Sequence, residues 1–385
     1  MSNEKKIDSL MIFAGEASGD LQGALLADEI RRICPSVKIS GSGGIKMKEA
    51  GIELLLDTTT LGVIGLWEGI KKSPLIISEY LKFKKEFIRR HPDLVIFIDA
   101  PASNMRLAKI ARRMGIKSVY FFPPSAWSAS LKRARKVGAS VDLVVNAFQF
   151  TSDTYEVAGV KNTFYTGHPL IDYMQKWKNA DKTELKKELG LKREKRYISL
   201  LPGSRVQEIE QILPLMIESA NMLLKQEKDI WFLIPVASPA LKNLIKDKLK
   251  YKELPLTLLD GKSQAAMAVS ELVILASGSA ALEAGILEVP MIITYRLNEL
   301  DYRIIRKFIK LRWAGLPNLI LKREVVPELL QDKATVNNIC RIASELLADS
   351  EKRREMLSGL KELNYVLGEP GVIKRIVAKI WDTVL

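Results

Sequence analysis

The sequence is poor in the residues from which metal centres and disulfides are built. Its 385 residues include two cysteines, Cys34 and Cys340, and two histidines, His91 and His168. Two cysteines so far apart in the chain cannot form a disulfide framework or a zinc cluster. Two histidines likewise exclude a metal site made of several histidines.

Long apolar runs are also missing. No window holds the ~18 uninterrupted apolar residues that a membrane-spanning helix needs. The closest window, 267–295, is interrupted by Glu271, Glu283 and Glu288. Residues 1–6 are polar, and the apolar run 10–14 is too short for the core of a signal peptide. These absences predict a soluble, reduced, cytoplasmic chain.

Acidic residues are fewer than basic ones. Asp and Glu number 45 against 59 Lys and Arg, which gives a formal charge of +14. This surplus favours an anionic partner, such as nucleic acid, acidic lipid or a phosphorylated small molecule, without choosing among them. The rest of the composition, with 47% hydrophobic and 27% charged residues, is that of a globular protein. The length suggests two or three domains of ~150 residues each.

Short runs rich in β-branched residues alternate with longer helical patterns, which is typical of βαβ units and a parallel sheet. The first series opens with a strand at 10–14, a small-residue loop at 15–20 and a helix at 21–33. A polar stretch follows Gly167-His168-Pro169, and a second series opens with a strand at 197–201. The pattern predicts an α/β protein with two successive doubly wound, Rossmann-like halves.

The other expected elements follow the same alternation. We expect strands at 37–40, 93–98, 118–122, 142–146, 163–166, 230–235, 256–259, 272–276 and 291–294. We expect helices at 79–90, 106–114 and 209–226, and turns at 41–44 and 202–205. The expected domains are 1–170 and 171–365. Residues 366–385 have helical periodicity and either pack back on the first domain or stay on the second.

Two loops of the first half lie at carboxyl ends of strands, where ligands bind in open parallel sheets. The loop 15–20 has glycines that allow close backbone approach, and Glu16 and Ser18 are its candidate polar residues. It lacks the dinucleotide fingerprint, so binding of NAD is unsupported. The alternative is a tight turn in which Ser18 or Asp20 caps the following helix.

Asp99 ends the second of these strands, after the apolar run 94–98. A carboxylate at the mouth of an apolar strand is desolvated on one side, which raises its pKa and suits a general base. The alternative is an aspartate that caps the helix after Pro101. His168 is the rival base, although a lone histidine at such a hinge is more often a structural residue.

Two loops of the second half point to a nucleotide. Free backbone N–H groups in Gly203-Ser204-Arg205, together with the arginine side chain, would hold a diphosphate without a metal. The loop Ser277-Gly278-Ser279 opens a helix, and we expect Glu283 in the first turn of that helix. A carboxylate there can accept hydrogen bonds from two ribose hydroxyls. The plainer alternative for the first loop is a capped turn with a surface arginine. For the second loop it is a glutamate that only complements the helix dipole. The lysine of a P-loop is absent.

Two apolar and basic segments suggest a membrane surface. Residues 61–77 are apolar and include Leu66, Trp67 and Ile70. In the stretch 299–313 four basic residues share one helical face, because their spacing is i, i+3, i+4, i+7. They are Arg303, Arg306, Lys307 and Lys310. A basic amphipathic helix is typical of a membrane-surface element, but a core-facing helix with a solvated face shows the same pattern.

Seven short segments, taken in order, carry a resemblance. They are Ala14-Gly15-Glu16-Ala17-Ser18-Gly19-Asp20, Ile98-Asp99-Ala100-Pro101, Pro124-Ser125-Ala126-Trp127, Gly167-His168, Leu201-Pro202-Gly203-Ser204-Arg205, Ala276-Ser277-Gly278-Ser279-Ala280-Ala281-Leu282-Glu283 and Leu316-Pro317-Asn318-Leu319. Through them the chain resembles the lipid-A-disaccharide synthase family of Gram-negative bacteria over essentially its whole length. The resemblance implies a GT-B glycosyltransferase that works by inversion, without metal or cofactor.

The resemblance also implies a reaction. It implies transfer of 2,3-diacylglucosamine from UDP to the 6-hydroxyl of 2,3-diacylglucosamine 1-phosphate (lipid X), giving the β-1,6-linked lipid A disaccharide. It further implies a peripheral protein on the cytoplasmic face of the inner membrane, in which the first domain takes the acceptor and its acyl chains and the second takes the UDP-sugar. A homodimer is a possible assembly.

The family's functional residues map onto this chain by position. Asp99 matches the proposed base, Arg205 the diphosphate-binding arginine and Glu283 the ribose-binding glutamate. Asn318 matches an asparagine near the nucleotide. The acceptor-side and first-loop candidates are Glu16, Ser18, Asn104, Ser125 and Trp127.

Two other classes of function compete with this one. The first is another GT-B enzyme that uses a UDP-sugar, such as a lipid II-type transferase or a UDP-N-acetylglucosamine epimerase. The second is a peripheral lipid-binding protein that keeps the fold without catalysis. Nucleic-acid binding lacks any recognised module in this sequence, so we expect no nucleic-acid partner.

Overall fold

The computed structural model describes residues 7–58, 73–124, 130–250, 253–296 and 312–385. It divides the chain into two compact units, Met1–Tyr173 with Leu367–Leu385 (unit 1) and Met174–Val366 (unit 2). Several predicted site residues lie outside the described residues, so the predictions for them stay predictions. They are Leu66, Trp67, Ile70, Ser125, Trp127, Arg303, Arg306, Lys307 and Lys310.

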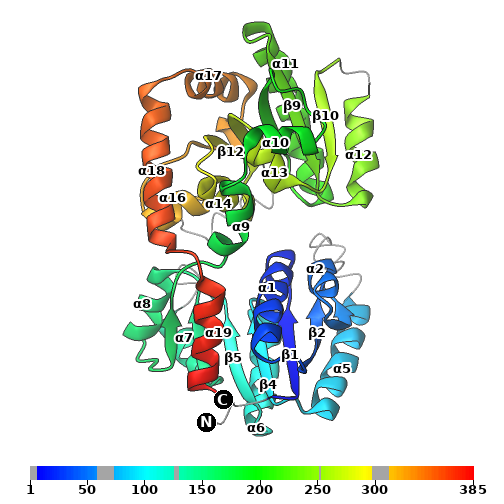
Figure 1. Cartoon of the computed structure of the whole chain (residues 1–385), viewed down its shortest axis with the longest axis vertical. Coiled ribbons are helices and arrows are strands. Elements are labelled where there is room, and N and C mark those ends of the chain that lie inside the picture. The colour runs from blue at the N-terminus through cyan, green and yellow to red at the C-terminus, as the bar shows by residue number, and fades with distance from the viewer. Residues whose placement is uncertain (1–6, 59–72, 125–129, 251–252, 297–311) are drawn as a thin grey trace. The chain divides into compact units, whose positions relative to one another are not determined.

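Unit 1 is built on a parallel sheet of seven strands in the order β3-β2-β1-β4-β5-β6-β7 (Figure 1). The strands are β1 Ser9–Ala14, β2 Lys38–Gly43, β3 Glu53–Asp57, β4 Leu94–Ile98, β5 Lys117–Phe121, β6 Leu143–Asn146 and β7 Thr163–Tyr165. The helices are α1 Ala17–Ile33, α2 Ile45–Glu49, α5 Ser73–Arg90, α6 Pro101–Arg113, α7 Leu131–Gly138, α8 Gln149–Val157 and α19 Val372–Thr383. Helix α9, Leu170–Lys178, contains the boundary with unit 2.

Alternate residues of these strands face opposite sides of the sheet, as the two-residue period of a strand requires. Leu10 and Ile12 of β1 pack in the cluster that includes α1 and α19. Met11 and Phe13 pack in the cluster that includes α5 and α6. Because helices cover both faces, the central strand β4 is apolar and buried along its whole length, as in other parallel sheets.

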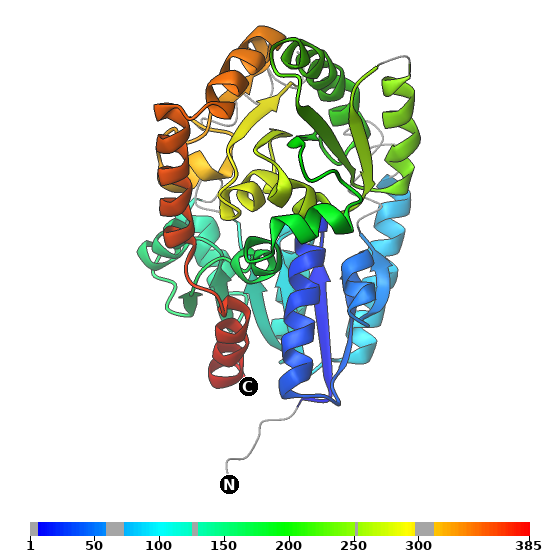
Figure 2. The ribbon, with the colours of Figure 1, turned by 45° about the horizontal axis from the view of Figure 1, so that its top comes forward.

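The C-terminal helix α19 packs on unit 1. Its apolar face is buried in the same cluster as β1 and α1, and Figures 1 and 2 both draw it, in red, within this unit. The carboxylate of Asp172 accepts hydrogen bonds from the N–H groups of Gly371, Val372 and Ile373 at 2.6, 3.2 and 2.8 Å. This contact fixes the start of α19 on unit 1. The sequence alone did not decide whether residues 366–385 pack on the first domain or on the second.

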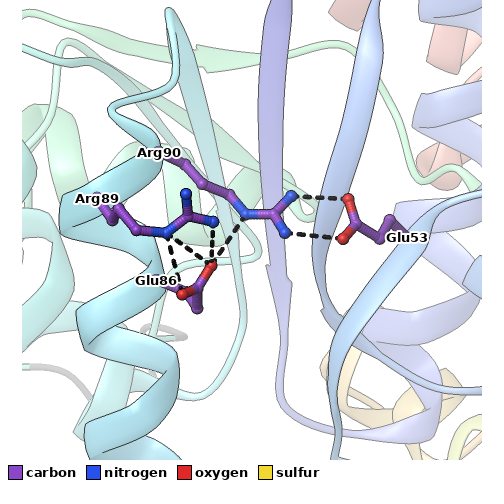
Figure 3. A network of polar contacts seen from close by, with 4 residues as sticks. All are labelled: Glu53, Glu86, Arg89 and Arg90. Atoms are coloured by element: carbon purple, nitrogen blue, oxygen red, sulfur yellow. Dashed lines mark hydrogen bonds and ion pairs between the residues drawn. The ribbon is translucent and has the colours of Figure 1, made fainter.

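An ion-pair network joins α5 to the edge strand β3 (Figure 3). Two guanidinium nitrogens of Arg90 each lie 2.7 Å from an oxygen of Glu53. Glu86 accepts hydrogen bonds from both Arg89 and Arg90. The bond to Arg90 lowers the pKa of Glu53. Exposed ion pairs add little stability, so the network serves mainly to fix the end of α5 against β3.

Unit 2 is a parallel sheet of six strands in the order β10-β9-β8-β11-β12-β13. The strands are β8 Arg196–Leu201, β9 Ile230–Val236, β10 Leu256–Asp260, β11 Leu272–Ala276, β12 Met291–Tyr295 and β13 Glu328–Leu330. The helices are α10 Lys182–Glu188, α11 Val206–Gln226, α12 Pro239–Leu249, α13 Ser263–Val269, α14 Ser279–Ile286, α16 Leu316–Leu321, α17 Val336–Leu347 and α18 Glu351–Leu367. No helix in the described ranges is long and apolar enough to cross a membrane.

Several predicted boundaries were wrong. Helix α5 begins at Ser73, six residues earlier than predicted. Helix α1 begins at Ala17, so the loop before it is only Gly15-Glu16. Strand β2 continues to Gly43 through the expected turn at 41–44, and a Cβ at Gly41 would lie 1.9 Å from the carbonyl oxygen of Ile12 on β1. That glycine serves close strand pairing instead of a turn. Helix α6 begins at Pro101, five residues earlier than predicted.

Candidate active site

The chain turns sharply where β4 ends. Asp99 and Ala100 both have left-handed backbone angles, with φ of +53° and +43°, which residues with a β-carbon disfavour. The carbonyl oxygen of Asp99 accepts hydrogen bonds from the hydroxyl of Tyr120 and the Nδ2 of Asn104, both at 2.8 Å. Asn104 is buried and also donates to the carbonyl of Ile98 at 3.1 Å. Backbone strain held in place by its surroundings is typical of functional sites.

A glycine makes room for this turn. A Cβ at Gly15 would lie 2.3 Å from the Cβ of Ala100, a distance that two carbon atoms cannot adopt without movement of the backbone. The glycine of the first loop therefore serves the neighbouring loop of β4. The closeness of Gly15 to Ala100 also brings the next residue, Glu16, near enough to Asp99 to affect its pKa.

The environment of Asp99 raises its pKa. Burial is the largest cause, the carboxyl of Glu16 raises the pKa further, and a hydrogen bond from the N–H of Ala100 opposes both. The predicted rise in pKa is confirmed. The alternative role as a helix cap is not supported, because the N-cap residue of α6 is Ala100, which makes no side-chain cap hydrogen bond.

A cavity of about 220 Å³ opens beside Asp99 within unit 1. Its walls are prolines and two aromatic rings, those of Phe122 and Phe148. Asp99, Arg133 and Thr151 also line it, and they supply its charged and hydroxyl groups. An apolar pocket with a few polar groups and a carboxylate of raised pKa is the usual form of a substrate site.

The other first-loop candidates lie at the start of α1. Glu16 precedes the helix and Ser18 is in its first turn; both are exposed, and the side chain of Glu16 makes no cap hydrogen bond. Asp20, the other suggested cap, is buried and accepts the N–H groups of Gly44 and Met47 at 2.7 and 3.0 Å. It therefore caps α2 instead of α1.

His168 is a structural residue. It is buried, and its Nδ1 accepts the N–H of Leu170 at 3.1 Å. Its ring lies between those of Phe122 and Phe148, with centroids 5.3 and 5.1 Å away. Burial lowers its pKa to about 3, so the ring is neutral at physiological pH and its contacts are those of a packed core residue. The structure gives no support to His168 as the base.

In unit 2 the loop after β8 is already occupied by a carboxylate. The Oε2 of Glu208 accepts the N–H groups of Ser204 and Arg205 at 2.9 and 3.3 Å. A Cβ at Gly203, where φ is +119°, would lie 2.2 Å from that oxygen. The prediction that these N–H groups are free was wrong, because the glutamate three residues along closes the turn as in a capping box. The side chain of Arg205 is exposed.

Glu283 lies in the second turn of α14, not in the first as predicted. The helix begins at Ser279, so Glu283 is its fifth residue, too far along to complement the N-terminal dipole well. Burial raises its pKa to about 7, and a 2.7 Å hydrogen bond from the Nε2 of Gln264 opposes that rise. Ahead of it, Ser277 donates to the carbonyl of Ala314 at 3.1 Å, and Gly278 has open space where a Cβ would stand.

The amide of Asn318 is fully used within the protein. Its Nδ2 donates to the carbonyl of Val326 at 2.8 Å and to Glu328 at 2.7 Å. Its Oδ1 accepts the N–H groups of Val325 and Val326 at 2.7 and 3.0 Å. Two donors and two acceptor sites are all that an amide has, so Asn318 shapes its loop in this structure.

Sequence reasoning missed Tyr120 and Glu208. The spacing of Glu208 from Arg205 is a readable signal, because an acidic residue three positions after a helix cap is typical of a capping box. Tyr120 gives no such signal, since its role depends on β5 lying beside β4.

Comparisons with known proteins agree with one another. A family described as "Lipid-A-disaccharide synthetase" matches residues 10–369. The lipid-A-disaccharide synthase of Geobacter sulfurreducens is 35% identical over 373 residues, covering 97% of this chain and 96% of that protein. The enzyme of the same name from Chromobacterium violaceum is 34% identical over 370 residues, covering 95% of each.

Solved structures share the fold at low sequence identity. A UDP-GlcNAc 2-epimerase from Neisseria meningitidis, bound to UDP-GlcNAc, has a TM-score of 0.64 at 13% identity and covers 97% of this chain and 99% of that one. The UDP-GlcNAc 2-epimerase of Methanocaldococcus jannaschii has a TM-score of 0.55 at 14% identity and covers 97% and 98%. The likeness establishes the GT-B type of fold, with two parallel-sheet α/β units.

Proposed function

The chain belongs to the lipid-A-disaccharide synthase family of glycosyltransferases, and from this premise we propose the substrates and the residues that act on them. The donor is UDP-2,3-diacylglucosamine and the acceptor is lipid X, whose 6-hydroxyl attacks the anomeric carbon in one displacement with inversion. The products are the β-1,6 disaccharide 1-phosphate and UDP.

The observation that carries this proposal is the state of Asp99. A carboxylate in a strained turn, with a raised pKa and a cavity beside it, suits a group that removes a proton from an alcohol. Such a base contributes about 10²–10⁴-fold to the rate. Asn104 and Tyr120 act as positioning residues, because both hold the carbonyl of Asp99.

Unit 2 takes the nucleotide in this proposal. UDP leaves with negative charge on its β-phosphate, and the exposed guanidinium of Arg205 stabilises that charge. The phosphate takes the place of the Glu208 carboxylate at the N–H groups of Ser204 and Arg205, exchanging one anion for another. Ser277, Gly278 and Ser279 contact the nucleotide, Glu283 binds the ribose, and Asn318 holds the neighbouring loop in shape.

The remaining assignments rest on sequence and family membership. The surplus of positive charge suits a protein that binds peripherally to the cytoplasmic face of the inner membrane, where both acylated substrates lie. In this proposal the segments 61–77 and 299–313 contact lipid, and Ser125 and Trp127 contact the acceptor. Assembly as a homodimer is part of the same proposal.

The direct test is incubation of the purified chain with UDP-2,3-diacylglucosamine and lipid X in mixed micelles, followed by mass analysis. We expect the disaccharide 1-phosphate and one equivalent of UDP. Release of UDP without a disaccharide would indicate hydrolysis or epimerase-like chemistry. Binding of UDP without any turnover would support the silent lipid-binding alternative and overturn the proposal.

A further inference from the structure

The cavity beside Asp99 holds two polar groups that proton removal does not use. Arg133, on α7, and Thr151, in the first turn of α8, line the same cavity as Asp99. A base needs only the acceptor hydroxyl within its reach. A guanidinium and a hydroxyl at the same cavity therefore call for a different explanation.

Thr151 is the unusual member of this pair. It is only 2% exposed, yet in the described part of the chain its Oγ1 has no hydrogen-bond partner. Buried hydroxyls in proteins nearly always have one, and leaving one unpaired costs about 1–3 kcal/mol. An unpaired hydroxyl that lines a cavity indicates that the missing partner is a ligand.

The surroundings of Thr151 favour a negatively charged ligand. Phe148, the residue before α8, also lines the cavity, so the N-terminal turn of this nine-residue helix borders it. Helix N-termini carry partial positive charge. Arg133 lies close enough to α8 to oppose the rise in pKa that burial gives Tyr155, one helical turn beyond Thr151. A guanidinium, a hydroxyl and a helix N-terminus together are typical of a phosphate site.

The size of the cavity gives the second constraint. A single water needs ~10–15 Å³, so about 220 Å³ holds a group of many atoms instead of a lone ion. The rings of Phe122 and Phe148 and the prolines supply an apolar wall. The ligand thus combines an alcohol for Asp99, a ring for the apolar wall and an anion for Arg133.

We propose that Arg133 and Thr151 bind the anomeric phosphate of the acceptor sugar and so select a phosphorylated acceptor. This inference rests on the proposed function, because that function supplies an acceptor with a hydroxyl at one end and a phosphate at the other. It assigns to unit 1 a specificity site distinct from the diphosphate site of unit 2.

The test compares two acceptors, lipid X and the same diacylglucosamine without its 1-phosphate, in the full-length protein. Arg133→Gln removes the charge. Thr151→Val removes the hydroxyl at nearly constant shape, and it also removes an unpaired buried group, so the variant should be at least as stable as the wild type. Lys132→Gln is the matched control, because Lys132 lies on the same helix, is exposed and does not line the cavity.

We expect the wild type to prefer lipid X. Arg133→Gln should raise the KM for lipid X at least tenfold, and Thr151→Val should raise it several-fold, with kcat and the KM for the donor nearly unchanged. Neither variant should change the KM for the unphosphorylated acceptor, and Lys132→Gln should change neither KM.

Three other results would overturn the inference. They are an equal loss with both acceptors, a rise in the donor KM instead of the acceptor KM, and no change in either variant. In all three the wild type still makes the disaccharide, so the proposed function survives. If the wild type makes no disaccharide from either acceptor, the proposed function itself fails and this inference fails with it.

Discussion

The two units carry their candidate residues at the same place, the carboxyl ends of parallel strands, but they hold them in opposite ways. In unit 1, Asp99 and Ala100 are in disfavoured backbone angles, and the hydroxyl of Thr151 has no hydrogen-bond partner among the described residues. In unit 2, Glu208 closes the loop of Arg205, and the amide of Asn318 makes four hydrogen bonds.

This difference matches the two tasks of a group transfer. A general base of this kind needs a pKa above the ordinary value of a carboxyl group. That shift requires burial, and the rest of unit 1 maintains both the burial and the backbone strain. In the proposed mechanism, a site that binds and releases a nucleotide needs a stable resting state, which the Glu208 carboxylate provides until a phosphate replaces it. Mutations can therefore test separately the backbone strain in unit 1 and the exchange of carboxylate for phosphate in unit 2.

The largest expected effect is that of Asp99→Asn. The amide keeps the shape but cannot accept the proton, so kcat should fall about 10²–10⁴-fold while the affinity for UDP stays unchanged. Turnover at saturating substrates and UDP calorimetry measure the two quantities. Near-normal turnover would remove Asp99 from the mechanism and with it the contrast between the units.

Arg205→Gln should have the next largest effect, in unit 2. Removal of one charge-assisted contact to the leaving group costs about 2–4 kcal/mol in the transition state, which corresponds to about 30- to 1,000-fold in kcat. The pH dependence of the remaining activity should be that of the wild type, because Asp99 is untouched. Arg193→Gln is a control with the same loss of charge on an exposed residue of unit 2. A shifted pH profile in Arg205→Gln would mean that the two units do not act separately.

Much of the fold could be predicted because burial on both faces makes strands such as Leu94–Ile98 continuously apolar. Loops at strand ends then indicated where polar groups gather. The pattern also gave the C-terminal helix, although its partner could not be read, because an apolar helical face does not specify which surface covers it.

The details of the site could not be predicted, since each depends on a neighbour that is distant in sequence. The left-handed turn at Asp99 depends on Gly15, Asn104 and Tyr120. The misplacement of Glu283 came from a helix start uncertain by a few residues, which is the least reliable part of a sequence pattern. The target of Asp20 lies on α2, which sequence spacing does not reveal.

A pair of glycines tests the contrast on the backbone itself. Gly15→Ala places a Cβ 2.3 Å from that of Ala100, so we expect a loss of about 1–3 kcal/mol in the free energy of unfolding and a lower kcat, with normal UDP affinity. Gly278→Ala meets open space in an extended backbone, so its stability should be unchanged. If a nucleotide lies against this loop, the affinity of the Gly278→Ala variant for UDP should fall. Denaturant unfolding and UDP calorimetry on both variants measure these effects. The comparison between the units would be contradicted if Gly278→Ala lost stability while Gly15→Ala lost only affinity for UDP.

Glu283→Gln tests the raised pKa of a carboxyl group in unit 2. Burial raises the folded-state pKa to about 7 from the ordinary value of 4.5, so the folded chain binds more protons than the unfolded chain between these values. The free energy of unfolding must therefore fall as the pH rises from about 4.5 to 7. The Tm difference between Glu283→Gln and the wild type should shift in favour of the variant over this window. A difference that is constant with pH would show that the pKa of Glu283 is the same in the folded and the unfolded chain.

The smallest expected effect sharpens the comparison at the base. Glu16 raises the pKa of Asp99 through its charge, and only the deprotonated carboxylate can act, so activity is lost as the pH falls through that pKa. Glu16→Gln removes the negative charge and should move the acidic limb of kcat/KM to lower pH. Glu29→Gln, the same change farther along α1, should leave the limb in place. If both variants move the limb, the effect is not specific to Glu16. If neither moves it, burial alone raises the pKa of Asp99. The strained turn would then suffice without help from the first loop.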